Sequence, residues 1–217
     1  MSGTFDKNAF MQFLMDQGVL KFGEFTLNSG RVSPYFFNLG QVSSGAAFAQ
    51  LGRAYAHTLQ ASGLACDVLF GPAYKGIPIA VAGAAALHEV ASIDVGVAYN
   101  RKEAKDHGEG GRLVGAELSG SVVLVDDVLT SGKALREAVA LVADSDATIS
   151  GVVIALDRQE RFSDADKTAV MQLQEDLQVP VISIAKMDDI VEFLGNSDAA
   201  DSELLLAMQN YRREYCL

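Results

Sequence analysis

The chain has 217 residues, of which 49% are hydrophobic, and a formal net charge of −11. This length allows one sizeable core and does not require two full domains. The acidic balance argues against general binding to nucleic acid or to anionic membranes, because these partners are held chiefly by clustered Lys and Arg. We expect no membrane span, since no apolar run is long enough, and no secretory signal. With Cys66 and Cys216 as the only cysteines, a reducing cytoplasm is the expected location.

The first part of the chain predicts a helix over residues 6–17 and extended segments over residues 20–27 and 35–38. A second helix is predicted to begin at Ser43 or Ser44. Its apolar residues keep helical spacing until a Ser-Gly pair at 62–63 ends it.

Short apolar runs then alternate with helical patterns. The runs are continuously apolar, which indicates strands covered on both faces. Such a series predicts an α/β fold with a parallel sheet of about five strands flanked by helices. The predicted strands are residues 66–70, 95–99, 121–125, 149–156 and 181–184, the helices between them are 77–88, 132–143 and 164–177, and two more helices are expected over 188–217.

Ligands of an open parallel sheet bind beyond the carboxyl ends of its strands, and residues 122–134 carry the strongest candidate site there. A predicted strand runs into Asp126 and Asp127, then into a hydroxyl-rich loop and the start of a helix. Loop amides and the positive helix end suit a phosphate, whereas the carboxylates suit sugar hydroxyls. The alternative is an ordinary turn whose polar residues only cap the helix.

A second candidate, residues 70–78, is a tight turn between a predicted strand and helix, with Gly, Pro and Lys75. Its amides and one cation suit an anion such as pyrophosphate, although a plain turn would look similar. A third is residues 100–112, which contain Arg101, Lys102, Lys105 and three glycines among four residues. Such a stretch predicts a loop with no fixed fold when empty, or simply a solvated mobile loop.

Together these stretches resemble the orotate phosphoribosyltransferases, which are type I phosphoribosyltransferases. Residues 122–134 resemble the signature that binds 5-phosphoribosyl 1-diphosphate (PRPP), residues 70–78 the pyrophosphate loop, and residues 102–108 the mobile catalytic loop of the family. The resemblance runs from about residue 19 to 215 and is closest to the bacterial enzymes. It implies a single domain over residues 1–217, made of an N-terminal helix and small hood (about 1–40), a parallel-sheet core (about 63–185) and C-terminal helices (about 186–217).

Two further stretches resemble the parts of the family that hold the base. Residues 22–38 resemble the hood, which implies that Phe36 and Phe37 lie against the orotate ring. Residues 156–160 resemble the opposite wall, which implies that Arg158 meets the orotate carboxylate. On physical grounds alone, the two Phe would more often be core residues and the Arg an ordinary surface residue.

The resemblance implies transfer of ribose 5-phosphate from PRPP to orotate, giving orotidine 5′-monophosphate and pyrophosphate in pyrimidine (UMP) biosynthesis. It implies Mg²⁺ as cofactor with no direct protein ligand, and a homodimer whose mobile loops complete the partner's site. Asp126 and Asp127 would orient the ribose hydroxyls, and Lys105 or His107 would protonate or polarise the pyrophosphate. The implied catalytic residues also include Arg101 and Lys102, and the other substrate-binding residues are Tyr74, Lys75, Val128, Leu129, Thr130, Ser131, Gly132, Lys133 and Ala134.

The chain departs from the family pattern at two positions. Asn28 stands where family members often have Lys, and Lys133 replaces a small residue of the phosphate loop. The resemblance also implies a non-proline cis peptide between Ala73 and Tyr74. The alternatives are a phosphoribosyltransferase for another base, and a PRPP-sensing regulator, which would need a nucleic-acid surface that this acidic chain lacks.

Overall fold

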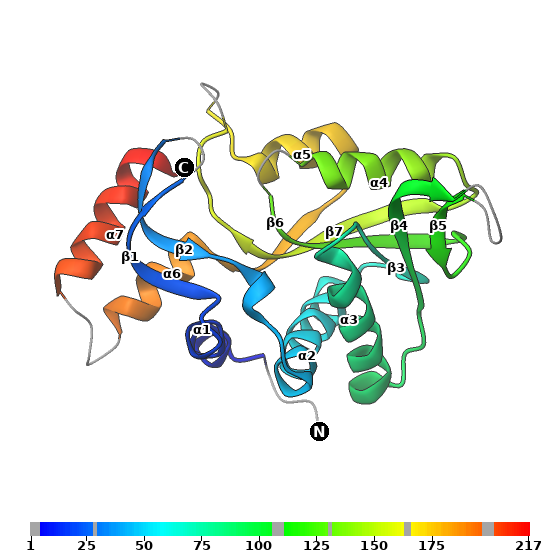
Figure 1. The fold of residues 1–217 in the computed structure, drawn as a ribbon, viewed down its shortest axis with the longest axis horizontal. Coiled ribbons are helices and arrows are strands. Elements are labelled where there is room, and N and C mark those ends of the chain that lie inside the picture. The colour runs from blue at the N-terminus through cyan, green and yellow to red at the C-terminus, as the bar shows by residue number, and fades with distance from the viewer. Residues whose placement is uncertain (1–4, 28–29, 106–110, 130–131, 163–165, 197–201) are drawn as a thin grey trace.

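The computed structural model describes residues 5–27, 30–105, 111–129, 132–162, 166–196 and 202–217, without the side chains of residues 104, 105 and 111 (Figure 1). Its helices are α1 (Lys7–Asp16), the short 3-10 helix η1 (Leu39–Gln41), α2 (Gly45–Ser62), α3 (Gly76–Ala91), α4 (Lys133–Ala143), α5 (Ala169–Leu177), α6 (Met187–Gly195) and α7 (Ser202–Tyr215). Its strands are β1 (Leu20–Thr26), β2 (Val32–Phe37), β3 (Val68–Gly71), β4 (Gly96–Lys105), β5 (Gly111–Gly115), β6 (Ser121–Val128), β7 (Thr148–Asp157) and β8 (Val181–Lys186).

A six-stranded sheet with the order β5-β4-β3-β6-β7-β8 forms the centre of the molecule. Five of its strands are parallel, and β5 is an antiparallel edge strand on β4. β3 lies in the middle, with Val68 opposite both Gly96 of β4 and Val122 of β6. The predicted α/β fold and its parallel sheet are therefore confirmed. None of the described helices is both long and apolar enough to cross a membrane.

Burial on both faces explains the continuously apolar strands. Successive side chains of a strand point to opposite faces. In β6, Val122 and Leu124 pack in one cluster with α4 and α5, whereas Val123 and Val125 pack in the other with α2 and α3. All four are at most 1% exposed. Figure 1 shows α4 and α5 on one side of the sheet and α2 and α3 on the other.

The hood is the antiparallel hairpin of β1 and β2, which stands beside the sheet next to α1, α6 and α7 (Figure 1). Tyr35 of β2 is fully buried, and its ring meets that of Tyr211 in α7 edge to face, with 6.0 Å between centroids. The hood is thus packed against the C-terminal helix, in the larger of the two hydrophobic clusters.

The end signals of α2 were predicted correctly. Ser44 Oγ accepts a hydrogen bond from the Ala47 amide at 3.1 Å, and Gly63 ends the helix with a left-handed φ of 68°. The two extended segments, the five parallel strands and the two C-terminal helices are also confirmed, with shifts of a few residues at their ends.

Two sequence predictions differ from the structure. The helix predicted over residues 164–177 begins only at Ala169, because Thr168 caps it through the Met171 amide and pairs with Arg161 in an antiparallel bridge. The stretch 100–112, predicted to lack a fixed fold, extends β4 to Lys105 and enters β5 at Gly111. Cross-strand hydrogen bonds at the sheet edge fix a backbone whose charged side chains carry no apolar periodicity. Residues 106–110 lie outside the described part.

Candidate active site

Two adjoining pockets lie at the carboxyl ends of β3, β6 and β7, and Val128 and Leu129 line both. The first, which we call the hood pocket, has a volume of about 480 Å³ and is bounded by the hood, Lys75 and residues 156–162. The second, the turn pocket, has a volume of about 490 Å³ and is bounded by Ala73, β4, Asp126 and the start of α4. Both cavities therefore lie at the carboxyl ends of the parallel strands, where the sequence analysis predicted that a ligand would bind.

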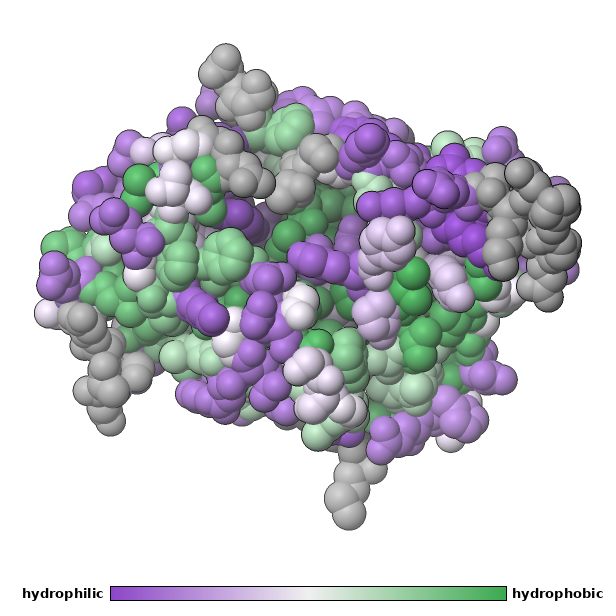
Figure 2. All heavy atoms as spheres, viewed as in Figure 1, coloured by the Kyte–Doolittle hydropathy of each residue, from purple (hydrophilic) through white to green (hydrophobic). Residues whose placement is uncertain are grey.

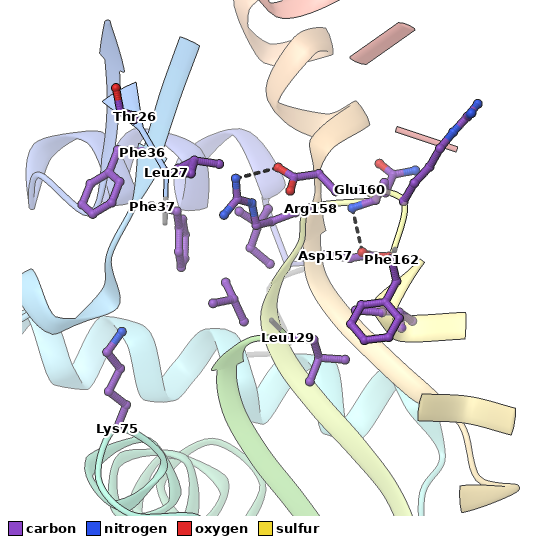
Figure 3. Close-up of a pocket in the computed structure, with 16 residues that line it drawn as sticks. Thr26, Leu27, Phe36, Phe37, Lys75, Leu129, Asp157, Arg158, Glu160 and Phe162 are labelled. Carbon is purple, nitrogen blue, oxygen red and sulfur yellow. Dashed lines mark hydrogen bonds and ion pairs between the residues drawn. The ribbon is translucent and has the colours of Figure 1, made fainter. Parts of the chain in front are cut away.

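The hood pocket brings together the residues predicted to hold a base. Figure 3 shows Phe36 and Phe37 on the hood side and Arg158 reaching toward them from the end of β7. Phe36 is 41% exposed and stacks on Phe25, with 5.5 Å between ring centroids. The two Phe are therefore not both core residues, and an exposed aromatic surface remains for a planar ligand.

Arg158 is held by two neighbours. Its Nε donates to the Tyr35 hydroxyl at 3.0 Å, and its Nη2 donates to Glu160 Oε1 at 2.6 Å. Burial raises the pKa of Tyr35 above its ordinary range, so that hydroxyl remains neutral. The guanidinium also lies over the Tyr35 ring, 5.2 Å from its centroid. Arg158 is thus an oriented cation rather than an ordinary surface side chain.

The turn after β3 depends on two glycines. A Cβ on Gly71 would lie 2.1 Å from the carbonyl oxygen of Gly76, so the start of α3 packs directly on the strand end. The Ala73 amide donates to Oδ1 of buried Asn100 at 3.0 Å, which joins the turn to β4. The predicted cis peptide between Ala73 and Tyr74 is present.

The end of β6 carries the paired carboxylates. Lys75 Nζ lies 2.6 Å from Asp127 Oδ2, and the Asp127 amide donates to Asp126 Oδ1 at 2.9 Å. Tyr55 of α2 donates to the Asp126 carbonyl at 2.7 Å. Burial and the adjacent charge of Asp127 raise the pKa of Asp126 to about 7. One of the two carboxylates is therefore balanced by a cation, while the other is near its ionisation point at neutral pH.

The two helices that begin at these pockets, α3 and α4, differ at their N-termini from α1, α2 and α5. α1, α2 and α5 are capped by the side chains of Asp6, Ser44 and Thr168. Among the described residues, no side chain caps α3 or α4, and α4 follows Gly132, whose φ is 65°. Uncapped amides at a helix start suit an anion. Gly132, Lys133 and Ala134 line the turn pocket, as Lys102 and Asp126 do.

The remaining candidates divide into two groups. Lys102, which lines the turn pocket, has its Nζ 4.5 Å from the ring centroid of Tyr74, which is 66% exposed. Arg101 belongs to the same strand, β4. The side chain of Lys105 and the whole of His107, Thr130, Ser131 and Asn28 lie outside the described residues.

Four residues without an assigned role in the sequence analysis support this site: Tyr35, Tyr55, Asn100 and Glu160. Each bonds to a residue far along the chain or on another element, so its spacing in the sequence carries no signal. The one available hint was a polar Asn at the end of an apolar strand, since buried amides need partners.

Comparison with known proteins places this geometry in a family. Residues 38–185 match the family model of the phosphoribosyl transferase domain. The orotate phosphoribosyltransferases of Alteromonas mediterranea and of Pseudomonas syringae pv. syringae are 52% and 51% identical to this chain, over 95% of it and 96% of their own length. The chain belongs to the orotate phosphoribosyltransferase family.

The fold agrees with that family. The crystal structure of the orotate phosphoribosyltransferase from Francisella tularensis superposes with a TM-score of 0.87 at 38% identity, covering 96% of this chain and all of that one. A PRPP complex of the Mycobacterium tuberculosis orotate phosphoribosyltransferase is 21% identical and covers 85% of this chain and 99% of its own, with a TM-score of 0.62, which indicates a shared fold. The sequence prediction of an orotate phosphoribosyltransferase is thus confirmed at the level of family and fold.

Proposed function

We propose that the protein transfers ribose 5-phosphate from PRPP to orotate, forming orotidine 5′-monophosphate and pyrophosphate in pyrimidine (UMP) biosynthesis. The observation that carries this proposal is the pair of adjoining pockets. One offers aromatic rings and an oriented Arg158, and the other offers the carboxylate of Asp126 beside the start of α4, which no described side chain caps. Membership of the family points to the same reaction.

In the hood pocket, a planar base would lie against Phe36 and Phe37, with its carboxylate against Arg158. A guanidinium meets a carboxylate through two parallel hydrogen bonds. Nε and one proton of Nη2 are already used by Tyr35 and Glu160. Among the described residues, Nη1 has no hydrogen-bond partner, so Nη1 and the second proton of Nη2 remain for the base.

In the turn pocket, the backbone amides at the start of α4, from Gly132 to Ala134, would hold the 5-phosphate together with Thr130 and Ser131. Asp126 and Asp127 would accept hydrogen bonds from the ribose hydroxyls. Val128 and Leu129, which line both pockets, would lie beneath the ribose where base and phosphate sites meet.

During the reaction, the bond between C1 of the ribose and the pyrophosphate oxygen breaks, and a bond from C1 to a ring nitrogen of orotate forms as that nitrogen loses its proton. The ribose gains positive charge and the pyrophosphate negative charge, so placing charges is the main task of the site. Lys102 and Arg101 of β4, with Lys105 and His107, would close over the pyrophosphate, and Lys105 or His107 would supply its proton. Tyr74 and Lys75 would bind the same group from the turn.

Mg²⁺ is the cofactor that fits this chemistry. The carboxylate of Asp126 lines the turn pocket, the adjacent Asp127 pairs with Lys75, and Mg²⁺ prefers oxygen ligands while keeping several waters. When bound with pyrophosphate, it would neutralise part of the leaving charge. We assign it no direct protein ligand, and Asp126 would hold it through water or the ribose hydroxyls. Calorimetric titration with PRPP should show tighter binding with Mg²⁺ than without, and a smaller gain in Asp126→Asn.

We also propose a cytoplasmic homodimer with a shared active site. An apolar groove of about 450 Å³ lies between α2 and α3, lined by Phe48, Ile77 and Val81 among others. Val81 is 51% exposed. Figure 2 shows hydrophobic residues at the surface over these helices. Exposed apolar patches of this kind often mark protein interfaces. A reducing location is supported by the free thiols of Cys66 and Cys216.

The experiment that tests the proposed function is an assay of base consumption with PRPP and Mg²⁺. Orotate should be consumed and pyrophosphate released in equal amounts, while uracil, hypoxanthine and adenine in parallel reactions should be consumed far more slowly. Faster use of one of the other bases would contradict the assignment of orotate. Consumption of none of them would contradict transferase activity as a whole.

A further inference from the structure

The orientation of Arg158 comes from residues other than the aromatic side chains Phe36 and Phe37 of the hood pocket. Two of its three guanidinium nitrogens are engaged, Nε by the Tyr35 hydroxyl and Nη2 by Glu160. Figure 3 shows the bond to Glu160. The side chains of Arg158 and Glu160 are only 20% and 18% exposed. Two bonds from different directions fix the plane of a guanidinium, whereas one bond leaves it free to turn about its axis.

Glu160 is itself held in place by the C-terminal helix and the hood. The Tyr211 hydroxyl of α7 donates to Glu160 Oε1 at 2.8 Å, which is the same oxygen that Arg158 binds. Arg31, which directly precedes the hood strand β2, has its Nη1 3.5 Å from Glu160 Oε2. Glu160 is therefore a shared acceptor that links α7 and the hood to Arg158.

Main-chain bonds tie the backbone around Arg158 to the same end of the chain. The Arg161 amide donates to the Tyr215 carbonyl at 2.9 Å, and the Leu217 amide donates to the Gln159 carbonyl at 3.0 Å. These bonds form an antiparallel bridge centred on Glu160 and Cys216. The backbone next to Arg158 and the partner of its side chain are thus fixed by one element, the C-terminal segment.

We propose that Glu160, fixed by Tyr211, is a positioning residue that orients the Arg158 guanidinium for the carboxylate of the base. The inference rests on the proposed function, because it assigns Arg158 to that carboxylate. A long Arg side chain loses rotamer entropy when it binds a ligand, and a guanidinium that is already oriented loses less. Arg31 balances the charge of Glu160, so the cluster of two Arg and one Glu keeps a net positive charge for an anionic base.

The central test separates the hydrogen bond from the charge of Glu160. Glu160→Ala removes both bonds to Oε1 and should raise the KM for orotate about 10-fold while the KM for PRPP and kcat change less than about 2-fold. Glu160→Gln keeps an acceptor oxygen in the same place and should restore the KM for orotate to within about 3-fold of the wild type. A residue needed only for general folding would lower activity toward both substrates and would not show this split.

A double-mutant cycle tests whether Glu160 acts through Arg158. If it does, Glu160→Ala should not raise the KM for orotate further in an Arg158→Ala background, because the group it positions is gone. Additive increases from the two substitutions would overturn the proposal. So would a single Glu160→Ala variant whose KM for orotate equals that of the wild type.

Tyr211→Phe offers a milder version with a matched control. The Phe ring keeps the packing on Tyr35 but removes the hydroxyl that fixes Glu160, so the KM for orotate should rise about 3-fold. Tyr215→Phe removes a hydroxyl from the same helix that contacts neither Glu160 nor Arg158, and should leave the KM unchanged. Equal effects of the two variants would overturn the role of Tyr211. If the wild type does not consume orotate, the proposed function fails instead, which keeps the two failures distinct.

Discussion

Lys75 Nζ lies 2.6 Å from Asp127 Oδ2, although 52 residues separate the two in the chain. The contact joins the turn after β3 to the end of β6. Lys75 is half exposed, with 50% of its side-chain surface accessible, whereas Asp127 is buried. The pair therefore brings one fixed positive charge to the boundary between the hood pocket and the two carboxylates.

Replacing this cation should change how activity depends on pH. Burial and Asp127 raise the pKa of Asp126 to about 7, and the charge of Lys75 opposes that rise. In Lys75→Met the opposing charge is lost, so the pKa of Asp126 should rise further. If ionised Asp126 binds the ribose, kcat/KM for PRPP should fall as the pH drops below about 7. In the variant, the pH at which this acidic limb of the profile falls should be about 0.5 to 1 unit higher.

The measurement is kcat/KM for PRPP between pH 5.5 and 9. Lys7→Met, which removes a cation paired with Asp189 far from both pockets, is the control and should leave the limb in place. A downward shift or no shift in Lys75→Met would contradict the coupling.

Asp126 should also cost stability at neutral and higher pH. Its folded pKa of about 7 lies above the unfolded value near 3.8. Folding therefore favours the protonated form, and this contribution is lost as pH rises through 7. Asp126→Asn, which keeps an acceptor for the Asp127 amide, should gain stability relative to the wild type as pH rises. At about 1.4 kcal/mol per pKa unit, the gain should be on the order of 2 kcal/mol larger at pH 8 than at pH 5.

Urea unfolding at the two pH values gives the comparison, and activity should fall in the same variant. A stability difference that is identical at pH 5 and pH 8 would show that ionisation of Asp126 is not the cause.

Gly71 should tolerate no side chain. A Cβ there would lie 2.1 Å from the Gly76 carbonyl oxygen and 2.4 Å from its carbonyl carbon, both of them backbone atoms that cannot move aside. Gly71→Ala should destabilise the protein by about 3 kcal/mol or more, as overpacking of backbone does. Gly45→Ala is the matched control, since its Cβ would meet nothing within 4 Å and should be neutral or stabilising by less than about 1 kcal/mol. Equal urea-unfolding midpoints for the two variants would refute the close packing of Gly71 against the Gly76 carbonyl.

The sequence predicted the elements whose signals are local. Ser44 and Gly63 marked the ends of α2, and continuous apolar runs marked strands that are buried on both faces. The start of α5 was missed because Thr168, its true cap, is selected by a bridge to Arg161 on the preceding segment. β5 was missed because its residues gain order from the sheet edge and not from their own pattern.

The candidate site shows the same division. Asp126, Asp127 and Lys75 lie in motifs, and the structure brings them together. The bonds of Asn100, Tyr55 and Glu160 depend on which elements the fold places side by side. Residue spacing within one segment cannot predict a hydrogen bond to a distant segment, so the roles of these three residues are visible only in the structure.

A shared site predicts complementation between inactive subunits. In the proposed dimer, a mixed pair of Lys105→Ala and Asp127→Ala subunits contains one site with an intact loop and intact carboxylates. Random mixing should then restore about a quarter of the wild-type activity, since about half of the dimers are mixed and each has one good site. Lys105→Ala mixed with His107→Ala is the control and should regain nothing, because both changes affect the same loop. No recovery by proven Lys105–Asp127 heterodimers would contradict a shared site.

Arg158 should select orotate over uracil, because the two bases differ by one carboxylate. The structure leaves Nη1 and part of Nη2 for that group, while Tyr35 and Glu160 hold the rest of the guanidinium. Losing a charge-assisted contact in a closed site costs roughly 2 to 4 kcal/mol, or about 30-fold to 1,000-fold in kcat/KM for orotate. Arg158→Ala should therefore raise the KM for orotate far more than the KM for PRPP.

Lys at this position should recover only part of the loss, because an ammonium supplies charge without the planar pair of donors. Lys also cannot reach Tyr35 and Glu160 with the same two bonds, so its charge would not be fixed in direction. The deciding measurement is the ratio of kcat/KM for orotate to that for uracil in the wild type, Arg158→Ala and Arg158→Lys. The ratio should fall in the order Arg, Lys, Ala, and uracil alone should change little. If the ratio is the same in all three proteins, Arg158 does not bind the carboxylate, and the preference for orotate must come from another contact of the hood pocket.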